Sequence, residues 1–246
     1  MQRAATTAWK CVTAAADALL SLLYPPRCAV CRTLGASMPL CAQCAAAVLP
    51  VPEPFCARCG HAMKPDTDCN GCRQRPPAFD CARALGAYQG VLREAVHHFK
   101  YRHCPALAEP LGSLLAAHAR THSEALHRLQ YDSVLPMPMH AARQRQRGYN
   151  QSERLARVVA RELHLALDTT LLVRTRMTRP QVGLTARRRR SNLQGAFRVC
   201  RPQEAAGKTF LLIDDVMTTG ASLSECAAML KLAGARHVYA LALAAG

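Results

Sequence analysis

The stretch that decides the fold is Phe210-Leu-Leu-Ile-Asp-Asp-Val-Met-Thr-Thr-Gly-Ala-Ser222, which runs on into a helical pattern over residues 223–232. The apolar run 210–213 is typical of a buried strand, which Asp214 and Asp215 would end, and Thr-Thr-Gly predicts a turn. At the carboxyl end of a parallel strand, such a turn points backbone amides and a helix N-terminus at one anion. The stretch therefore predicts a strand, a phosphate-binding loop and a helix.

Side chains of this loop complement its backbone. Gly220 allows close approach to a ligand and backbone angles that other residues avoid. The hydroxyls of Thr218, Thr219 and Ser222 add donors around the same anion. The paired carboxylates instead suit sugar hydroxyls, a metal-bound hydroxyl or a cationic transition state. One half of the site favours an anion and the other favours diols or positive charge, as a ribose 5-phosphate that ionises at C1 would require.

Composition limits the architecture and the partners. A chain of 246 residues, half of them apolar and 5% aromatic, has room for one α/β domain and a small accessory module. The formal net charge is +16, and residues 137–201 carry +12 of it, which indicates a polyanionic partner for that segment. No Gly-x-x-x-x-Gly-Lys precedes a Ser or Thr, so the phosphate loop is not a Walker loop.

The first residues are rich in Ala and Leu, like a secretion signal. However, Asp17 interrupts the apolar run, which is too short to span a membrane, and no clean cleavage site precedes Pro25. We therefore expect residues 1–24 to form an amphipathic helix that covers the next module, with no membrane insertion and a cytoplasmic location.

Four Cys-x-x-Cys pairs follow as a tandem repeat, in which each member of the first two pairs recurs 28 residues later. The eight cysteines are Cys28, Cys31, Cys41, Cys44, Cys56, Cys59, Cys69 and Cys72. Two such pairs complete a four-thiolate site for tetrahedral zinc, and segments this short need metal to fold. The spacing predicts a double zinc ribbon over residues 25–76 with two structural Zn²⁺ sites. Sequential pairing of the repeats is the preferred arrangement, exchange between halves stays open, and disulfides or redox-active pairs are the alternative.

Residues 80–246 have the alternating pattern of an α/β domain. Strands are expected at 82–88, 131–135 and 237–244, and helices at 91–101 and 107–119. A basic loop with Arg143, Arg145 and Arg147 precedes a helix that Asn150 or Ser152 would cap.

A second basic segment, residues 174–197, is predicted to be a mobile flap that closes over a bound pyrophosphate and excludes water. Nucleic-acid binding, or a solvated basic run, is the alternative for this segment.

The stretch 210–222 looks like the phosphoribosyl pyrophosphate (PRPP) loop of type I phosphoribosyltransferases. Three more ordered motifs make the chain resemble the ComF family over residues 20–246: Tyr24-Pro-Pro-Arg-Cys28, Arg147-Gly-Tyr-Asn-Gln-Ser-Glu153, and Arg179-Pro-Gln-Val-Gly-Leu184 with Arg190-Ser-Asn-Leu-Gln-Gly-Ala-Phe197. The resemblance implies an α/β, type I phosphoribosyltransferase-like fold, a parallel sheet flanked by helices, with a small N-terminal Cys-rich double zinc ribbon. It also implies a link to DNA uptake during natural competence.

By position, the resemblance implies that Asp214 and Asp215 are the catalytic pair on the ribose hydroxyls. It assigns PRPP binding to Val216, Met217, Thr218, Thr219, Gly220, Ala221 and Ser222. Pyrophosphate would lie between Mg²⁺ and the flap-side residues Arg147, Gln181, Arg187, Arg188 and Asn192. Thr218 stands where oxopurine salvage enzymes carry an acid, which disfavours salvage of the hypoxanthine type.

Two hypotheses follow. In the first, the protein binds Mg·PRPP and transfers ribosyl 5-phosphate to an acceptor that the sequence does not identify. In the second, it is a non-catalytic accessory of DNA processing that binds single-stranded DNA or a partner such as a competence helicase. A third, weaker interpretation makes the zinc ribbons only a structural cap on the larger domain.

Overall fold

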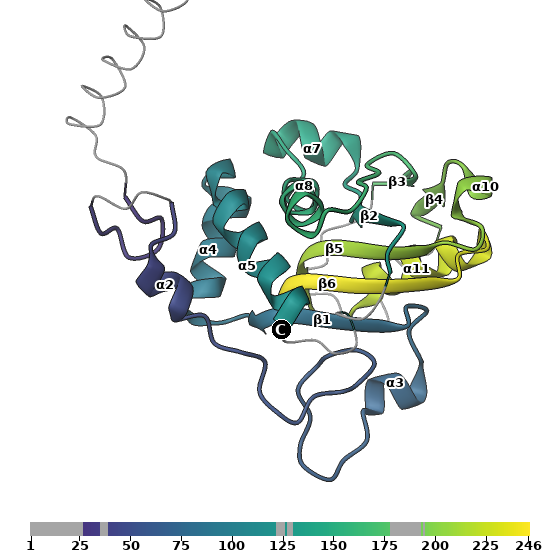
Figure 1. Ribbon diagram of the computed structural model, residues 1–246, viewed down its shortest axis with the longest axis horizontal. Coiled ribbons are helices and arrows are strands. Elements are labelled where there is room, and N and C mark those ends of the chain that lie inside the picture. The colour runs from purple at the N-terminus through teal and green to yellow at the C-terminus, as the bar shows by residue number, and fades with distance from the viewer. Residues whose placement is uncertain (1–26, 35–38, 122–125, 127–129, 178–192, 194) are drawn as a thin grey trace, which may run out of the picture.

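The computed structural model describes residues 27–34, 39–121, 126, 130–177, 193 and 195–246. The helix expected over residues 1–24 lies outside the described residues, as do Gln181, Arg187, Arg188 and Asn192 of the flap. The described chain forms a parallel sheet flanked by helices, with the Cys-rich segment along one edge (Figure 1). This architecture confirms the predicted fold class.

The main sheet has four parallel strands in the order β1-β6-β5-β2. Their bounds are β1 Cys81–Ala87, β2 Ser133–Pro136, β5 Thr209–Met217 and β6 His237–Ala245. Strand β5 lies inside the sheet with a continuous apolar run, as expected of a parallel strand covered on both faces. A short antiparallel pair, β3 Leu172–Arg174 and β4 Phe197–Val199, forms a second sheet.

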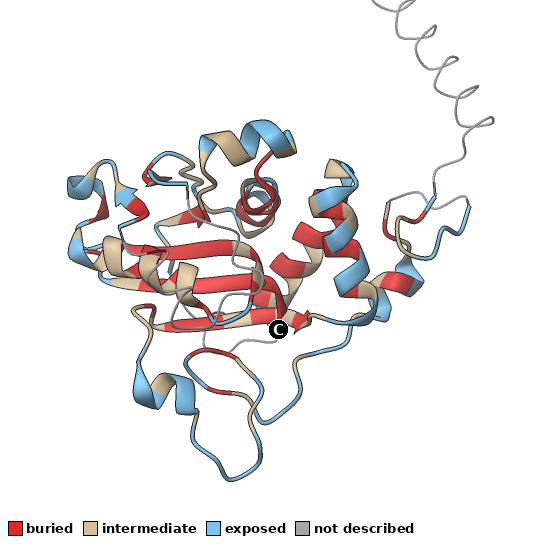
Figure 2. Cartoon of the chain, turned by 180° about the vertical axis from the view of Figure 1, so that it is seen from behind, coloured by how far each residue is buried: buried red, intermediate tan, exposed pale blue. Residues whose placement is uncertain are grey.

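Helices cover both faces of the main sheet (Figure 1). On one face lie α4 Gly90–Tyr101, the short η1 Pro105–Leu107, α5 Ala108–Thr121 and α8 Gln151–Leu163; on the other lies α11 Ala221–Leu232, with the β3–β4 pair. Alternate residues of β5 serve the two cores, because Leu211 packs with the first group and Leu212 with α11. Figure 2 shows these buried positions along the strands. Shorter helices are α2 Ala42–Ala46, α3 Asn70–Gln74, α7 Ala141–Arg147 and α10 Pro202–Ala205.

Two predictions of secondary structure are wrong. Strand β5 continues through both acids to Met217, because β6 runs beside it and Met217 pairs with Ala245. The strand therefore ends two residues later than expected, whereas the turn begins at Thr218, as predicted. Residues 141–147, expected as a basic loop, form α7. The amide of Ala142 donates to Nδ1 of His140 at the start of this helix, and Gly148 ends it at φ 84°.

The Cys-rich segment covers the outer edge of β1. The amide of Ala82 donates to the carbonyl of Arg58 at 2.8 Å, and the amide of Ala87 donates to the carbonyl of Leu49 at 3.0 Å. An uncovered edge strand offers such groups to other chains, so this segment closes the sheet at β1. Among the described residues, no helix combines the length and the apolar character needed to cross a membrane.

Candidate active site and metal centres

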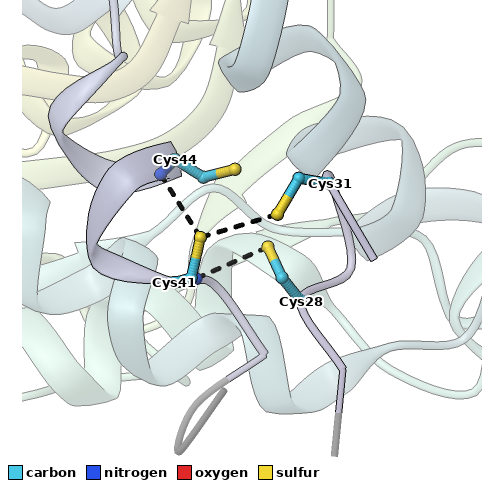
Figure 3. A group of neighbouring side chains, drawn as sticks. All are labelled: Cys28, Cys31, Cys41 and Cys44. Atoms are coloured by element: carbon cyan, nitrogen blue, oxygen red, sulfur yellow. Dashed lines mark hydrogen bonds between the residues drawn. The ribbon is translucent and has the colours of Figure 1, made fainter. Parts of the chain in front are cut away.

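The eight cysteines of the repeat form two groups of four, and the sulfurs of each group lie within 4.8 Å of one another. Figure 3 shows the first group, Cys28, Cys31, Cys41 and Cys44. The second is Cys56, Cys59, Cys69 and Cys72. Sulfur–sulfur distances of 3.6 Å in the first group, and of 3.7 and 3.8 Å in the second, match the ~3.8 Å edge of a tetrahedron with Zn–S bonds of ~2.3 Å. The donor sets thus fit two Zn²⁺ ions, and sequential pairing is confirmed.

Backbone amides surround the thiolates, as is usual around a metal. The amide of Cys41 donates to Cys28 Sγ at 3.4 Å, and that of Cys59 donates to Cys56 Sγ at 3.5 Å. Hydrogen bonds from the hydroxyl and the amide of Thr33 lower the pKa of Cys31 to about 6, which favours the ligating thiolate. With four protein ligands each and no open position, both sites are structural in character. The cysteines that the structure describes are all free of disulfides.

A cleft of about 690 Å³ opens where β5 and β2 end. It gathers the acids of β5, the start of the loop and the basic end of α7. Lining residues are Tyr88, Lys100, Tyr101, His103, Met137, Pro138, Met139, Arg143, Gln146, Arg147, Asn150, Ser152, Arg174, Asp214, Asp215, Val216, Thr218 and Ser222. The structure therefore brings Asp214, Asp215, Val216, Thr218, Ser222 and Arg147 of the predicted site together.

Beside the cleft, the loop itself forms a small cup of about 30 Å³, lined by Asp214 and residues 216–223. Met217, Thr219, Gly220 and Ala221 of the predicted site lie here. Gly220 has φ 67° and is the N-cap of α11, so the twelve-residue helix directs its positive end at the cup. The geometry is that of a helix N-terminal anion site.

The two acids have different partners. Asp215 is 9% exposed, and one of its oxygens lies 2.7 Å from Lys100 Nζ. Asp214 Oδ1 accepts from Ser152 Oγ at 3.1 Å and from the amide of Asp215 at 2.8 Å. Burial, followed by the charge of Asp215, raises the pKa of Asp214 to about 7, although Lys100 and the two hydrogen bonds oppose the shift. Burial disfavours the Lys100 ammonium, but Asp215 outweighs it and the pKa of Lys100 is raised.

Sequence reasoning missed Lys100, treating its neighbours His97 and His98 as a solvated helix face. A signal was present, because Lys100 continues the spacing of Leu92 and Val96 on the buried stripe of α4. A charged residue at such a position needs a partner, and Asp215 is that partner.

The capping choice is resolved in favour of Asn150, whose side chain accepts from the amide of Ser152 at 3.1 Å. Its amide group also donates to the carbonyl of Met137 at 3.0 Å, which fixes the segment after β2. The hydroxyl of Ser152 is then directed at Asp214.

Arg147 is held at the mouth of the cleft. Its guanidinium lies 5.3 Å from the ring centre of Tyr101 and donates to Gln151 Oε1 at 3.1 Å. Gln151 donates in turn to the carbonyl of Phe99. Arg147, Arg143 and Arg174 supply positive charge on the side of the cleft reached by α7 and β3.

Fold and metal sites together define a class: a parallel α/β domain that follows a double zinc ribbon. The profile of the double zinc ribbon domain matches residues 19–73. The DNA utilization protein YhgH of Escherichia coli O157:H7 is 33% identical over 213 residues, which cover 86% of each chain. Competence protein F of Haemophilus influenzae is 30% identical over 178 residues, covering 72% of this chain and 77% of that protein. The chain belongs to the ComF family.

Solved structures that align with part of this chain include a glutamine PRPP amidotransferase from B. subtilis complexed with ADP and GMP, with a TM-score of 0.40 and 17% identity. That match covers 59% of this chain and 30% of the other. TT1426 from Thermus thermophilus has a TM-score of 0.32 and 19% identity, covering 55% of this chain and 72% of that one. The domain boundaries 25–76 and 80–246 stay predictions.

Proposed function

We propose that the protein binds Mg·PRPP in the cleft and transfers its ribosyl 5-phosphate to an acceptor. The observation that carries this proposal is the cup at the N-terminus of α11, which Asp214 lines, next to the cleft that both carboxylates of β5 line. A ligand that fits both must be anionic at one end and carry hydroxyls or developing positive charge near the other. PRPP has this distribution.

In this arrangement, the loop residues 216–222 hold the 5-phosphate. Asp214 and Asp215 accept hydrogen bonds from the ribose hydroxyls and stabilise positive charge that develops at C1. Arg147, with the flap residues Gln181, Arg187, Arg188 and Asn192, orients the leaving pyrophosphate. When bound, Mg²⁺ supplies charge neutralisation on the pyrophosphate and is held mainly by oxygens of the substrate.

Isothermal titration with PRPP, with and without Mg²⁺, tests the first half of the proposal. We expect saturable binding that Mg²⁺ strengthens and that Asp214→Asn and Asp215→Asn each weaken about tenfold or more, because each removes a charged hydrogen-bond acceptor. Glu204→Gln, an exposed substitution on α10, is the matched control. Absence of saturable binding by the wild type, or wild-type affinity in both Asn variants, would contradict the proposal.

To find the acceptor, pyrophosphate release is measured with bases, amines and nucleic acids in turn. Release that requires both PRPP and one class of acceptor supports transfer. Zinc binding by eight cysteines requires reduced thiols, so the proposal places the protein in the cytoplasm.

A second candidate function is binding of single-stranded DNA in an accessory role, with or without a helicase partner. It is favoured by the three arginines of α7, and by relatives named for DNA utilization and competence. Arg145 is exposed and does not line the cleft, unlike Arg143 and Arg147. Under this candidate, Arg145→Ala reduces DNA affinity and its salt dependence while PRPP affinity is unchanged. If the affinity for DNA changes neither with salt concentration nor in Arg145→Ala, this second candidate function is rejected.

A further inference from the structure

The second zinc ribbon contacts the phosphate loop directly. His61 lies two residues after the zinc ligand Cys59, and its Nε2 meets the carbonyl of Thr218, the first residue after β5. A carbonyl only accepts hydrogen bonds, so Nε2 carries the hydrogen and donates it. This contact joins segments 157 residues apart in the chain.

The orientation of one peptide group follows from this contact. In a planar trans peptide, the carbonyl of Thr218 and the N–H of Thr219 point in opposite directions. His61 lines neither the cleft nor the cup, whereas Thr219 lines the cup. Holding the carbonyl toward His61 therefore keeps a partial negative charge out of the cup and turns the Thr219 amide away from His61. A carbonyl turned inward would repel a phosphate.

Two further contacts come from the linker that follows the second ribbon. The amide of Ala78 donates to Ser224 Oγ at 3.0 Å, in the first turn of α11. The ring of Phe79 is 1% exposed and lies 3.5 Å from the position that a Cβ on Gly220 would take. The loop is therefore contacted at its start, at its glycine and at the helix that follows.

The two ribbons differ in what they pack against. Cys28 and Cys44 of the first ribbon join the buried cluster of α4, α5 and α8. Cys56 and Cys59 of the second join the cluster of α11, which also contains Met217 at the end of β5. Each ribbon therefore serves as a control for the other.

We infer that His61 is a positioning residue for the phosphate loop, and that the second zinc ribbon rather than the first sets the loop's affinity for a sugar phosphate monoester. This inference rests on the proposed function, because it concerns the same cup. It gives the second ribbon a role in ligand binding beyond that of a cap on the sheet.

The test compares His61→Ala and His61→Gln with Lys64→Ala, an exposed substitution in the same ribbon. Three quantities are measured: zinc per chain, affinity for ribose 5-phosphate, and hydrogen exchange of the amides of residues 218–222. We expect all three variants to keep two zinc ions. His61→Ala should weaken ribose 5-phosphate binding about tenfold and speed exchange in the loop, because one hydrogen bond is lost. His61→Gln, which keeps an N–H donor, should recover most of both effects, and Lys64→Ala should resemble the wild type.

A second pair, Cys72→Ser and Cys31→Ser, each removes one ligand. We expect each to lose one zinc ion, but only Cys72→Ser to lose affinity for ribose 5-phosphate. If His61→Ala retains both zinc ions and has either wild-type affinity or wild-type exchange, the inference is overturned.

Hydrogen exchange needs no ligand, so it tests the contact between His61 and the loop independently of the proposed function. A wild type that binds neither ribose 5-phosphate nor PRPP would sink the proposed function. Unchanged loop exchange in His61→Ala would sink the inference.

Discussion

Asp214 and Asp215 are adjacent in the chain, yet one hydrogen-bonds to Ser152 and the other forms an ion pair with Lys100. Neutralisation of Asp215 allows two acids to stand side by side in a partly closed site. Burial instead disfavours the charged form of Asp214, which raises the pKa of this carboxyl.

Asp214→Asn should therefore stabilise the folded protein at pH 8. The pKa of Asp214 is about 7 in the folded state, above the ordinary value near 4, so the folded state binds more protons in between. The contribution of Asp214 to stability is full below about pH 4 and is lost as the pH rises through 7. We expect the Asn variant to gain up to about 4 kcal/mol at pH 8, which raises the Tm by several degrees, and to gain nothing at pH 4. Thermal denaturation of both proteins from pH 4 to pH 8 checks this prediction. Parallel profiles of Tm against pH for the wild type and the variant would contradict it.

Lys100→Met should destabilise the protein by about 3 kcal/mol, because it leaves the buried carboxylate of Asp215 without its counter-charge. The double variant Lys100→Met with Asp215→Asn should recover most of that loss. Arg161→Ala, which removes an exposed ion pair with Glu109, is the control and should cost less than about 1 kcal/mol. Urea unfolding measures all of these. If Lys100→Met destabilised the protein no more than Arg161→Ala does, the ion pair between Lys100 and Asp215 would not contribute to stability.

At the scale of elements, the strand, the loop and the helix around Asp214 were predictable, because an apolar run, a Thr-Thr-Gly turn and a helical pattern follow one another. The length of β5 was not, since Val216 and Met217 stay in the strand only because β6 lies beside them. Helix α7 was mistaken for a loop because its arginines and glutamines give no apolar stripe. Its ends were nevertheless marked by His140 and Gly148.

The junction of the Cys-rich segment with β1 predicts a contrast between two glycines. A Cβ on Gly86 would stand 2.3 Å from the carbonyl of Leu49, the group that accepts from Ala87. Gly148 has a positive φ but no atom within 4 Å of such a Cβ. Gly86→Ala should cost about 3 kcal/mol through this clash, and Gly148→Ala about 1 kcal/mol through backbone strain alone. Denaturant unfolding of both compares them, and an equal cost would show that the segment does not seat tightly on β1.

At the scale of the whole molecule, the cysteine spacing predicted both metal sites, and the preferred pairing within each repeat is confirmed. Where the ribbons sit was beyond the sequence. The contacts of Arg58 with Ala82 and of His61 with Thr218 join distant segments through backbone carbonyls, which leave no residue-specific signal. The pairing of Lys100 with Asp215 is instead an ion pair between side chains, and its signal, a lysine on the buried stripe of α4, was overlooked.

Removal of zinc should therefore affect the entire protein. A strong chelator should lower the Tm by several degrees and promote aggregation, because the ribbons lose the metal that folds them and uncover the edge of β1. Cys72→Ser should reproduce the effect in part, whereas Cys200→Ser, at an exposed cysteine outside both groups, should not. Scanning calorimetry with light scattering follows both changes. A chelated protein with an unchanged Tm would argue against the ribbons as part of the fold.

The most direct test of the central claim is a crystal structure of the protein soaked with PRPP and Mg²⁺. We predict density for the 5-phosphate in the cup of residues 216–223, within hydrogen-bond distance of loop amides, and the ribose hydroxyls on Asp214 and Asp215. Density only along the arginines of α7, with the cup filled by water, would contradict the account.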